Sequence, residues 1–377
     1  MATTHDPDAD GPTGRIQRTL DAVSEIVDET ENGALVTVAV ACLALAGAFV
    51  GFLLISPYTP AFLLVFVAAT AYGWVRHQEA TAKVVTLVMT VVTILILGLI
   101  TVFILLEARE VARFTSGEVF GITVPALEAF TTTEWRPARQ PRTFSMVPMI
   151  HGTVMVTIIS TLVAGPLGVA AALFISEIAP PRVREVVKPG VEILAGIPSI
   201  VYGFLGLAVL SPWVSDQFSL SGQGTYLFVG IVVGLMALPT VVSVAEDAIN
   251  SVPESMKSGS LAMGTTDWQT MTSITIPAAF SGISAAVLLG VGRAIGETMA
   301  ATVMLRNAPR LTEPLYNVFY GYGTLTSAIA ANYGSSFNEA RSALFLAGVV
   351  LFITVLAISI GSQLIESHMH RKLEGMD

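Results

Sequence analysis

Residues 83–106, KVVTLVMTVVTILILGLITVFILL, decide the fold class of this chain. The stretch carries one charged residue, Lys83, at its start. A helix needs about 20 apolar residues to cross the hydrocarbon core of a bilayer. Residues 83–106 therefore predict a transmembrane helix.

Further stretches of the same character precede and follow it, and we expect eight transmembrane helices in all. The other seven cover 34–55, 60–75, 151–177, 190–211, 225–245, 279–304 and 342–365. Of all residues, 53% are hydrophobic and only 12% are charged, whereas about a quarter are charged in a soluble domain. The sequence thus predicts an all-α polytopic membrane protein.

The ends of the chain are expected to be cytoplasmic. Residues 1–33 are acidic and predict a tail, in which Ile16, Leu20, Val23 and Val27 recur at the spacing of a short amphipathic helix. Eight spans put both termini on one side of the membrane. The loops on that side hold slightly more Lys and Arg than the outer loops, which favours a cell-membrane protein with both termini cytoplasmic.

Several classes of function are excluded by what the chain lacks. A net charge of −9 argues against nucleic acid as a partner. Cys42 is the only cysteine, so we expect neither a disulfide nor a cysteine metal site. No G-x-x-x-x-G-K-[ST] loop is present, so this chain would not hydrolyse ATP by that route. We predict no catalytic residues, no metal site and no cofactor.

The polar loop 246–278 predicts a short helix between two spans. Pro253 suits the first turn of a helix and Gly264 suits its end. Ile274 and Pro277 follow just before the next span. Such a helix, held across the end of a bundle, is shaped to fit a groove on a partner. The alternative is an ordinary connection with one helical turn.

The segment 196–203, GIPSIVYG, predicts a break within the span 190–211. Pro198 removes a helical hydrogen bond, and the glycines at both ends permit close backbone approach. We therefore assign a broken-helix motif to this segment, made by Gly196, Pro198, Ser199, Tyr202 and Gly203. A kink that serves packing alone is the other interpretation.

The stretch 292–300, GRAIGETMA, places two charges inside a predicted span. Arg293 and Glu297 are four residues apart, so on a continuous helix they would share one face and could pair. Placing a charged side chain in lipid costs at least about 2.5–3.5 kcal/mol, so such residues normally face the interior of the helix bundle and serve a function. One interpretation is an anion path lined by Arg293, Glu297 and Thr298. The other is a structural ion pair.

These stretches together resemble the PstC-type permease of phosphate ABC importers, a type I importer family. The loop is similar to the family pattern E-A-A-x-x-x-G-x9-I-x-L-P, with Gly264, Ile274 and Pro277 in place. Ser258, Gly259 and Ser260 stand where that pattern has Glu-Ala-Ala. The resemblance covers residues 83–377 and implies a six-helix core, with residues 34–82 as an additional transmembrane hairpin.

The resemblance also implies the partners and the mechanism. The chain would form half of a phosphate pathway beside a second, PstA-type permease. A PstB-type ATPase dimer would bind the 253–277 loop, and a PstS-type binding protein would deliver phosphate from outside. Rival interpretations are an ABC permease for molybdate or sulfate, a stand-alone secondary transporter, and a membrane scaffold or receptor.

Overall fold

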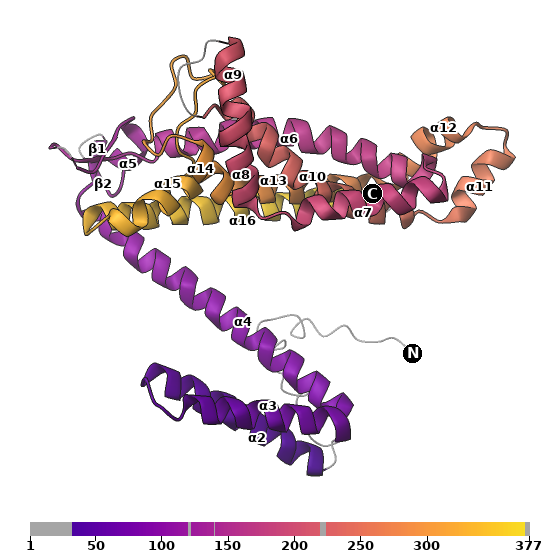
Figure 1. Cartoon of the computed structure of the whole chain (residues 1–377), viewed down its shortest axis with the longest axis horizontal. Coiled ribbons are helices and arrows are strands. Elements are labelled where there is room, and N and C mark those ends of the chain that lie inside the picture. Colours follow the sequence, from indigo (N-terminus) through magenta and orange to yellow (C-terminus); the bar gives the residue numbers. More distant parts are fainter. Residues whose placement is uncertain (1–31, 120–121, 139, 219–223, 374–377) are drawn as a thin grey trace. The chain divides into compact units, whose positions relative to one another are not determined.

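The computed structural model describes residues 32–119, 122–138, 140–218 and 224–373, and they are mostly helical (Figure 1). The amphipathic helix predicted within residues 16–27 lies outside these ranges. Among the described residues, seven helices are long and apolar enough to cross a membrane, and a bent pair makes eight if it counts as one span. The predicted all-α, multi-pass fold is thus confirmed.

The chain divides into two compact units, Met1–Thr101 and Val102–Asp377. Helix α4 (Gln78–Ala108) contributes residues to both. The boundary that the sequence suggested, between residues 82 and 83, falls inside this helix. No glycine or proline interrupts residues 78–97, so the helix has no local reason to stop there.

Unit 1 contains a tight helical hairpin. Helix α2 (Asn32–Leu53) and helix α3 (Thr59–Arg76) pack against each other through small residues on α2. A β-carbon on Gly47 would lie 2.8 Å from the ring of Phe62, so only glycine permits this approach.

Unit 2 is built on four long helices that run side by side in Figure 1. They are α6 (Val147–Leu173), α10 (Tyr226–Asn250), α13 (Ile276–Ile295) and α16 (Glu339–Leu373). Small residues again set the spacing, because Gly282 and Gly290 of α13 face Ala248 and Val241 of α10 with no room for a side chain.

The elements at the two ends of unit 2 differ in kind. One end carries the short segments of the loop before α6: a 3-10 turn (Arg109–Arg113), β1 (Gly117–Val119) paired antiparallel with β2 (Ile122–Val124), α5 (Glu128–Thr131), and β3 (Trp135–Arg136) paired with β4 (Thr143–Phe144). The opposite end carries α11 (Glu254–Ala262) and α12 (Asp267–Thr270) (Figure 1). The loop 246–278 and the loop before α6 therefore lie at opposite ends of the bundle.

Two predicted spans are not single helices: the span 190–211 contains the break that the sequence predicts, whereas the break in the span 279–304 corrects the sequence-based boundary. The segment 190–211 falls across α7 (Pro181–Gly196) and α8 (Ser199–Leu205), which continues through a π-turn (Gly206–Leu210) into α9 (Ser211–Phe218). The segment 279–304 is divided between α13 and α14 (Met299–Met304). In addition, the loop 306–341 holds a short helix, α15 (Leu325–Asn332), and a 3-10 turn (Tyr333–Ser335).

Candidate functional site

The first helix break lies between α7 and α8, which meet at an angle of 90°. Ile197 is extended, with φ −72° and ψ 127°, because the ring of a proline disfavours helical geometry in the residue before it. The hydroxyl of Tyr202 reaches back over the bend and donates to the carbonyl of Leu194 at 3.0 Å. The GIPSIVYG segment thus forms a sharp corner, and the hydrogen bond from Tyr202 stabilises it.

The second break lies between α13 and α14, at residues 296–298. The carboxylate of Glu297 accepts a hydrogen bond from the backbone N–H of Ala300 at 2.9 Å, and so caps α14. The hydroxyl of Thr326 donates to the carbonyl of Glu297 at 2.6 Å, and that of Thr298 to the carbonyl of Gly296 at 3.0 Å. Side chains thus satisfy backbone groups that the break leaves open, as a non-helical segment at membrane depth requires.

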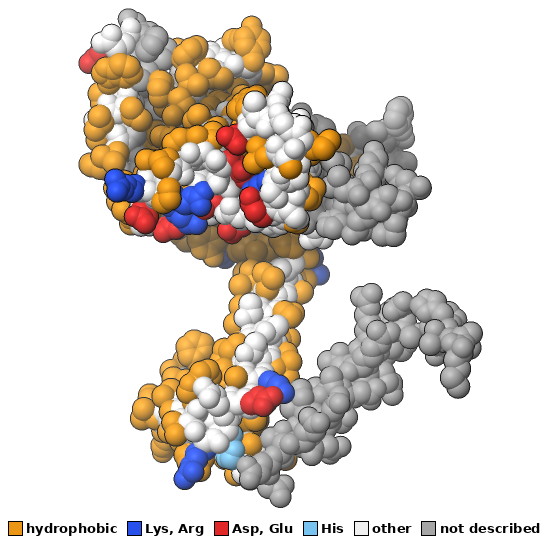
Figure 2. Space-filling model, turned by 90° about the vertical axis from the view of Figure 1, so that its right-hand side faces the viewer, with side chains coloured by type: hydrophobic (Ala, Val, Ile, Leu, Met, Phe, Trp, Pro, Cys, Tyr) orange, Lys and Arg blue, Asp and Glu red, His pale blue; other side chains and the backbone are white. Residues whose placement is uncertain are grey.

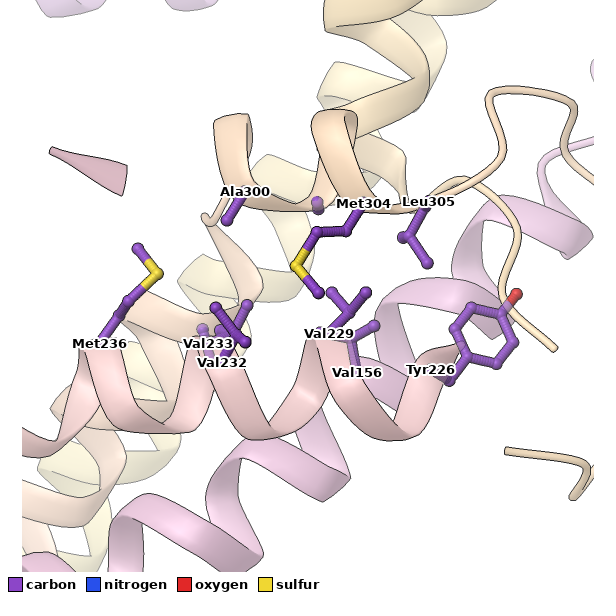
Figure 3. Close-up of a cluster of buried hydrophobic side chains, with 11 residues drawn as sticks. Val156, Tyr226, Val229, Val232, Val233, Met236, Ala300, Met304 and Leu305 are labelled. Atoms are coloured by element: carbon purple, nitrogen blue, oxygen red, sulfur yellow. The ribbon is translucent and has the colours of Figure 1, made fainter. Parts of the chain in front are cut away.

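The two breaks come together because α8 packs on α14. Gly203 of α8 faces Ala300 so closely that a β-carbon would lie 2.8 Å from the Ala300 Cα. Figure 3 shows the other side of α14, where Met304 and the neighbouring Leu305 pack against Val229 and Val233 of α10. Helix α14 is therefore held between α8 and the buried core of unit 2.

Arg293 lies on the last turn of α13, beside this meeting point. It is exposed in the isolated chain. Within the part of the chain that the structure describes, Arg293 forms no ion pair. The expectation that Arg293 and Glu297 pair on one helix face is wrong, because α13 ends at Ile295 and the Glu297 carboxylate caps α14 instead.

The loop 246–278 contains the short helix that the sequence predicts. Helix α11 begins directly after Pro253 and ends at Ala262, and Gly264 follows with φ +87°, a conformation that suits glycine. Thr266 then caps α12 in a capping box with Gln269. Ile274 lies in the π-turn (Met271–Thr275) before α13, and Pro277 lies in the first turn of α13.

The three residues at the Glu-Ala-Ala positions differ in their surroundings. Ser258 and Gly259 are exposed, whereas Ser260 is half-buried. The Ser260 hydroxyl lies 2.8 Å from the Thr265 hydroxyl and 3.1 Å from that of Thr270. Ser260 thus joins α11 to α12, while the other two positions face outward.

Two further features at this end of unit 2 are not predicted by the sequence. Met263 and Trp268, on either side of the turn between α11 and α12, expose 86% and 67% of their surface. Charged side chains gather on the same end (Figure 2), and they include the ion pairs Lys257–Glu177 and Lys188–Glu246. Isolated charges at the ends of apolar spans were visible in the sequence, but partners 80 and 58 residues apart were not.

Comparison with known proteins identifies the family. Residues 164–372 match the family described as "Binding-protein-dependent transport system inner membrane component". This matched region includes both helix breaks and the whole loop 246–278. The chain belongs to this family. As a member of the inner membrane component family, it is a transport component of the membrane.

Two relatives identified by sequence agree with this assignment. The chain is 41% identical over 233 residues to a probable ABC transporter permease protein, YqgH, of Bacillus subtilis (strain 168), covering 61% of this chain and 74% of that protein. It is 34% identical over 264 residues to the phosphate transport system permease protein PstC of Xylella fastidiosa (strain 9a5c), covering 64% and 79%. A MetNI methionine ABC transporter, solved in inward-facing conformations, matches with 20% identity and a TM-score of 0.48, covering 59% of this chain and 95% of that one.

Proposed function

We propose that this chain is the permease subunit of an ATP-driven phosphate importer and forms half of its translocation pathway. The observation that carries this proposal is the family match, joined to similarity with proteins named as phosphate transport permeases. The pathway would run beside Arg293, where the two helix breaks meet. Arg293, Glu297 and Thr298 line it in this proposal, together with the corner formed by Gly196, Pro198, Ser199, Tyr202 and Gly203.

Three properties of Arg293 support this place for the pathway. Its guanidinium is unpaired among the described residues, so it is free to attract an anion. It lies at the end of a helix inside the apolar part of the sequence, where a charged side chain without a function would carry a free-energy cost. It is also exposed on a single subunit, so a second, PstA-type permease would enclose it and complete the path.

The 253–277 loop is the proposed coupling site for a PstB-type ATPase dimer. Helix α11 lies at the end of the bundle, and the apolar side chains of Met263 and Trp268 beside it are free to enter a groove on a partner. This assignment makes the α11 end cytoplasmic, together with both termini. The loop before α6, at the opposite end, would then meet an extracellular PstS-type binding protein.

The decisive experiment measures uptake of radiolabelled phosphate into proteoliposomes. They would contain this chain with the second permease, the ATPase and the binding protein of the same organism. Uptake that needs ATP and all four components supports the proposal. Phosphate uptake in the absence of the ATPase would contradict it. Equal competition by molybdate or sulfate would instead assign the pathway to another oxyanion.

A further inference from the structure

The end of α6 is a polar junction where three other helices meet. Helix α6 widens there into a π-turn (Phe174–Ile178), a geometry that recurs at functional sites. The Nζ of Lys257 on α11 lies 2.6 Å from the Oε1 of Glu177 in this turn. The hydroxyl of Ser176 donates to the side-chain oxygen of Asn250, at the end of α10, at 2.6 Å.

Helix α7 is attached to the same turn through Arg184. The guanidinium donates from Nε to the carbonyl of Ile175 at 2.7 Å and from Nη2 to the carbonyl of Ser176 at 2.6 Å. A cation is favoured there because the last carbonyls of a helix carry partial negative charge. The planar fork of Arg184 binds two successive carbonyls, so the start of α7 is held in orientation as well as position.

A second contact holds the middle of α7. The Nζ of Lys188, one helical turn after Arg184, lies 3.0 Å from the Oε1 of Glu246 on α10. The Glu246 side chain is 4% exposed, so removal of Lys188 would leave a buried carboxylate without its ion-pair partner. Helix α7 itself buries no residue in the described structure. Polar contacts at one end and in the middle therefore contribute much of what positions it.

The Lys257–Glu177 contact joins α11 to this arrangement. Both side chains are largely shielded, with 14% and 18% exposed, so their attraction is screened less than that of a surface pair. A displacement of α11 thus acts directly on the turn to which α7 is attached. At its other end, α7 leads into the 90° corner before α8.

We propose that residues 175–177 form a transmission junction, through which Lys257 of α11 sets the position of α7 and of the corner at Ile197–Pro198. This inference rests on the proposed function, since it requires an ATPase that moves α11. Lys257, Glu177 and Arg184 are positioning residues in it, and none of them needs to contact phosphate.

The test follows α7 directly, without cargo. Spin labels at Ala195, near the end of α7, and at Leu235 of α10 would report their separation in the assembled complex, in a Cys42→Ala background. We expect ATP to change this separation in the parent protein. Lys257→Met should abolish the change, Lys257→Arg should preserve it, and the charge exchange Lys257→Glu with Glu177→Lys should restore it. Glu79→Gln, which removes an exposed ion pair with Lys83, is the matched control and should respond to ATP as the parent does.

Transport gives the second readout. Phosphate imported per ATP hydrolysed should fall about tenfold in Lys257→Met, as expected when coupling is lost, and recover in the exchange variant. An ATP-driven change that persists in Lys257→Met would overturn the proposal. If that variant fails to assemble, the exchange variant decides, and an assembled exchange variant without the change would also overturn it. A parent complex in which the labels move but phosphate is not imported would refute the proposed cargo and leave the junction standing.

Discussion

Gly203 and Ala300 lie in direct backbone contact, since a β-carbon on Gly203 would be 2.8 Å from the Ala300 Cα. This contact joins the helix after the first break to the helix after the second. It connects α8, which follows the mobile corner in our proposal, to α14, which is packed on the core of unit 2 (Figure 3).

Gly203→Ala should separate α8 from α14. The neighbouring atoms are backbone and cannot turn away, so overpacking of about 1–3 kcal/mol is expected. Thermal unfolding in detergent should occur at a lower temperature, and phosphate uptake by the complex should fall. Gly361→Ala is the control, because nothing lies within 4 Å of the new methyl group. Equal stability of the two variants would show that the approach of α8 to α14 is not tight.

Arg293→Gln should reduce phosphate uptake while leaving assembly intact. A hydrogen bond to a charged group contributes about 1.5–3 kcal/mol, which corresponds to a loss of tenfold or more. Arg293→Lys should retain part of the uptake, since it keeps the charge but not the planar fork. Arg341→Gln, at the start of α16, serves as the control. Full uptake by an assembled Arg293→Gln complex would make Arg293 a structural residue.

Replacing Glu297 separates its capping role from its charge. Glu297→Gln keeps an oxygen that can accept from the Ala300 N–H, so stability should change little. Glu297→Ala removes the cap and should cost about 1 kcal/mol. Both are measured by thermal unfolding of the purified chain. Should Glu297→Gln unfold as readily as Glu297→Ala, the negative charge rather than the cap is what stabilises the break.

Pro198→Ala should relax the corner between α7 and α8. Without the proline ring, Ile197 can become helical and the hydrogen bond of residue 198 can form. In a straight helix Ile193 and Phe204 would be about 16 Å apart, at 1.5 Å per residue, whereas a 90° bend brings them closer. Spin labels at these two exposed positions should therefore move apart in the variant. An unchanged separation would mean that packing, not Pro198, maintains the bend.

Gly264→Ala should loosen the turn between α11 and α12. The φ of +87° places a β-carbon in strain, and a left-handed conformation costs about 1–2 kcal/mol for an L-residue. Gly264→Asn should be milder, because asparagine tolerates this region better. Binding of the ATPase to the purified chain is the measurement, with Gly98→Ala, which also meets open space, as the control. Undiminished binding by Gly264→Ala would show that the turn does not position the coupling helix.

The membrane-spanning segments could be predicted from the sequence because their signal is local. An apolar run such as 83–106 needs no partner to be recognised, and Pro253 and Gly264 delimit α11 by backbone chemistry alone. The helix end at Ile295 was not predictable in the same way. The apolar pattern continues to residue 304, and one contact at the break comes from Thr326 of α15, whose hydroxyl donates to the carbonyl of Glu297.

By itself, the sequence determined the multi-pass helical class, the short helix α11 and the corner at Pro198, since each follows from hydrophobicity or from the backbone of one residue. Only the tertiary structure decided that Glu297 caps α14 rather than pairing with Arg293, and that Lys257 binds Glu177. The physical reason is that a charged side chain pairs with the group that lies nearest to it in space. The packing of the helices determines which groups are near one another, and the spacing of residues along the chain does not reveal it.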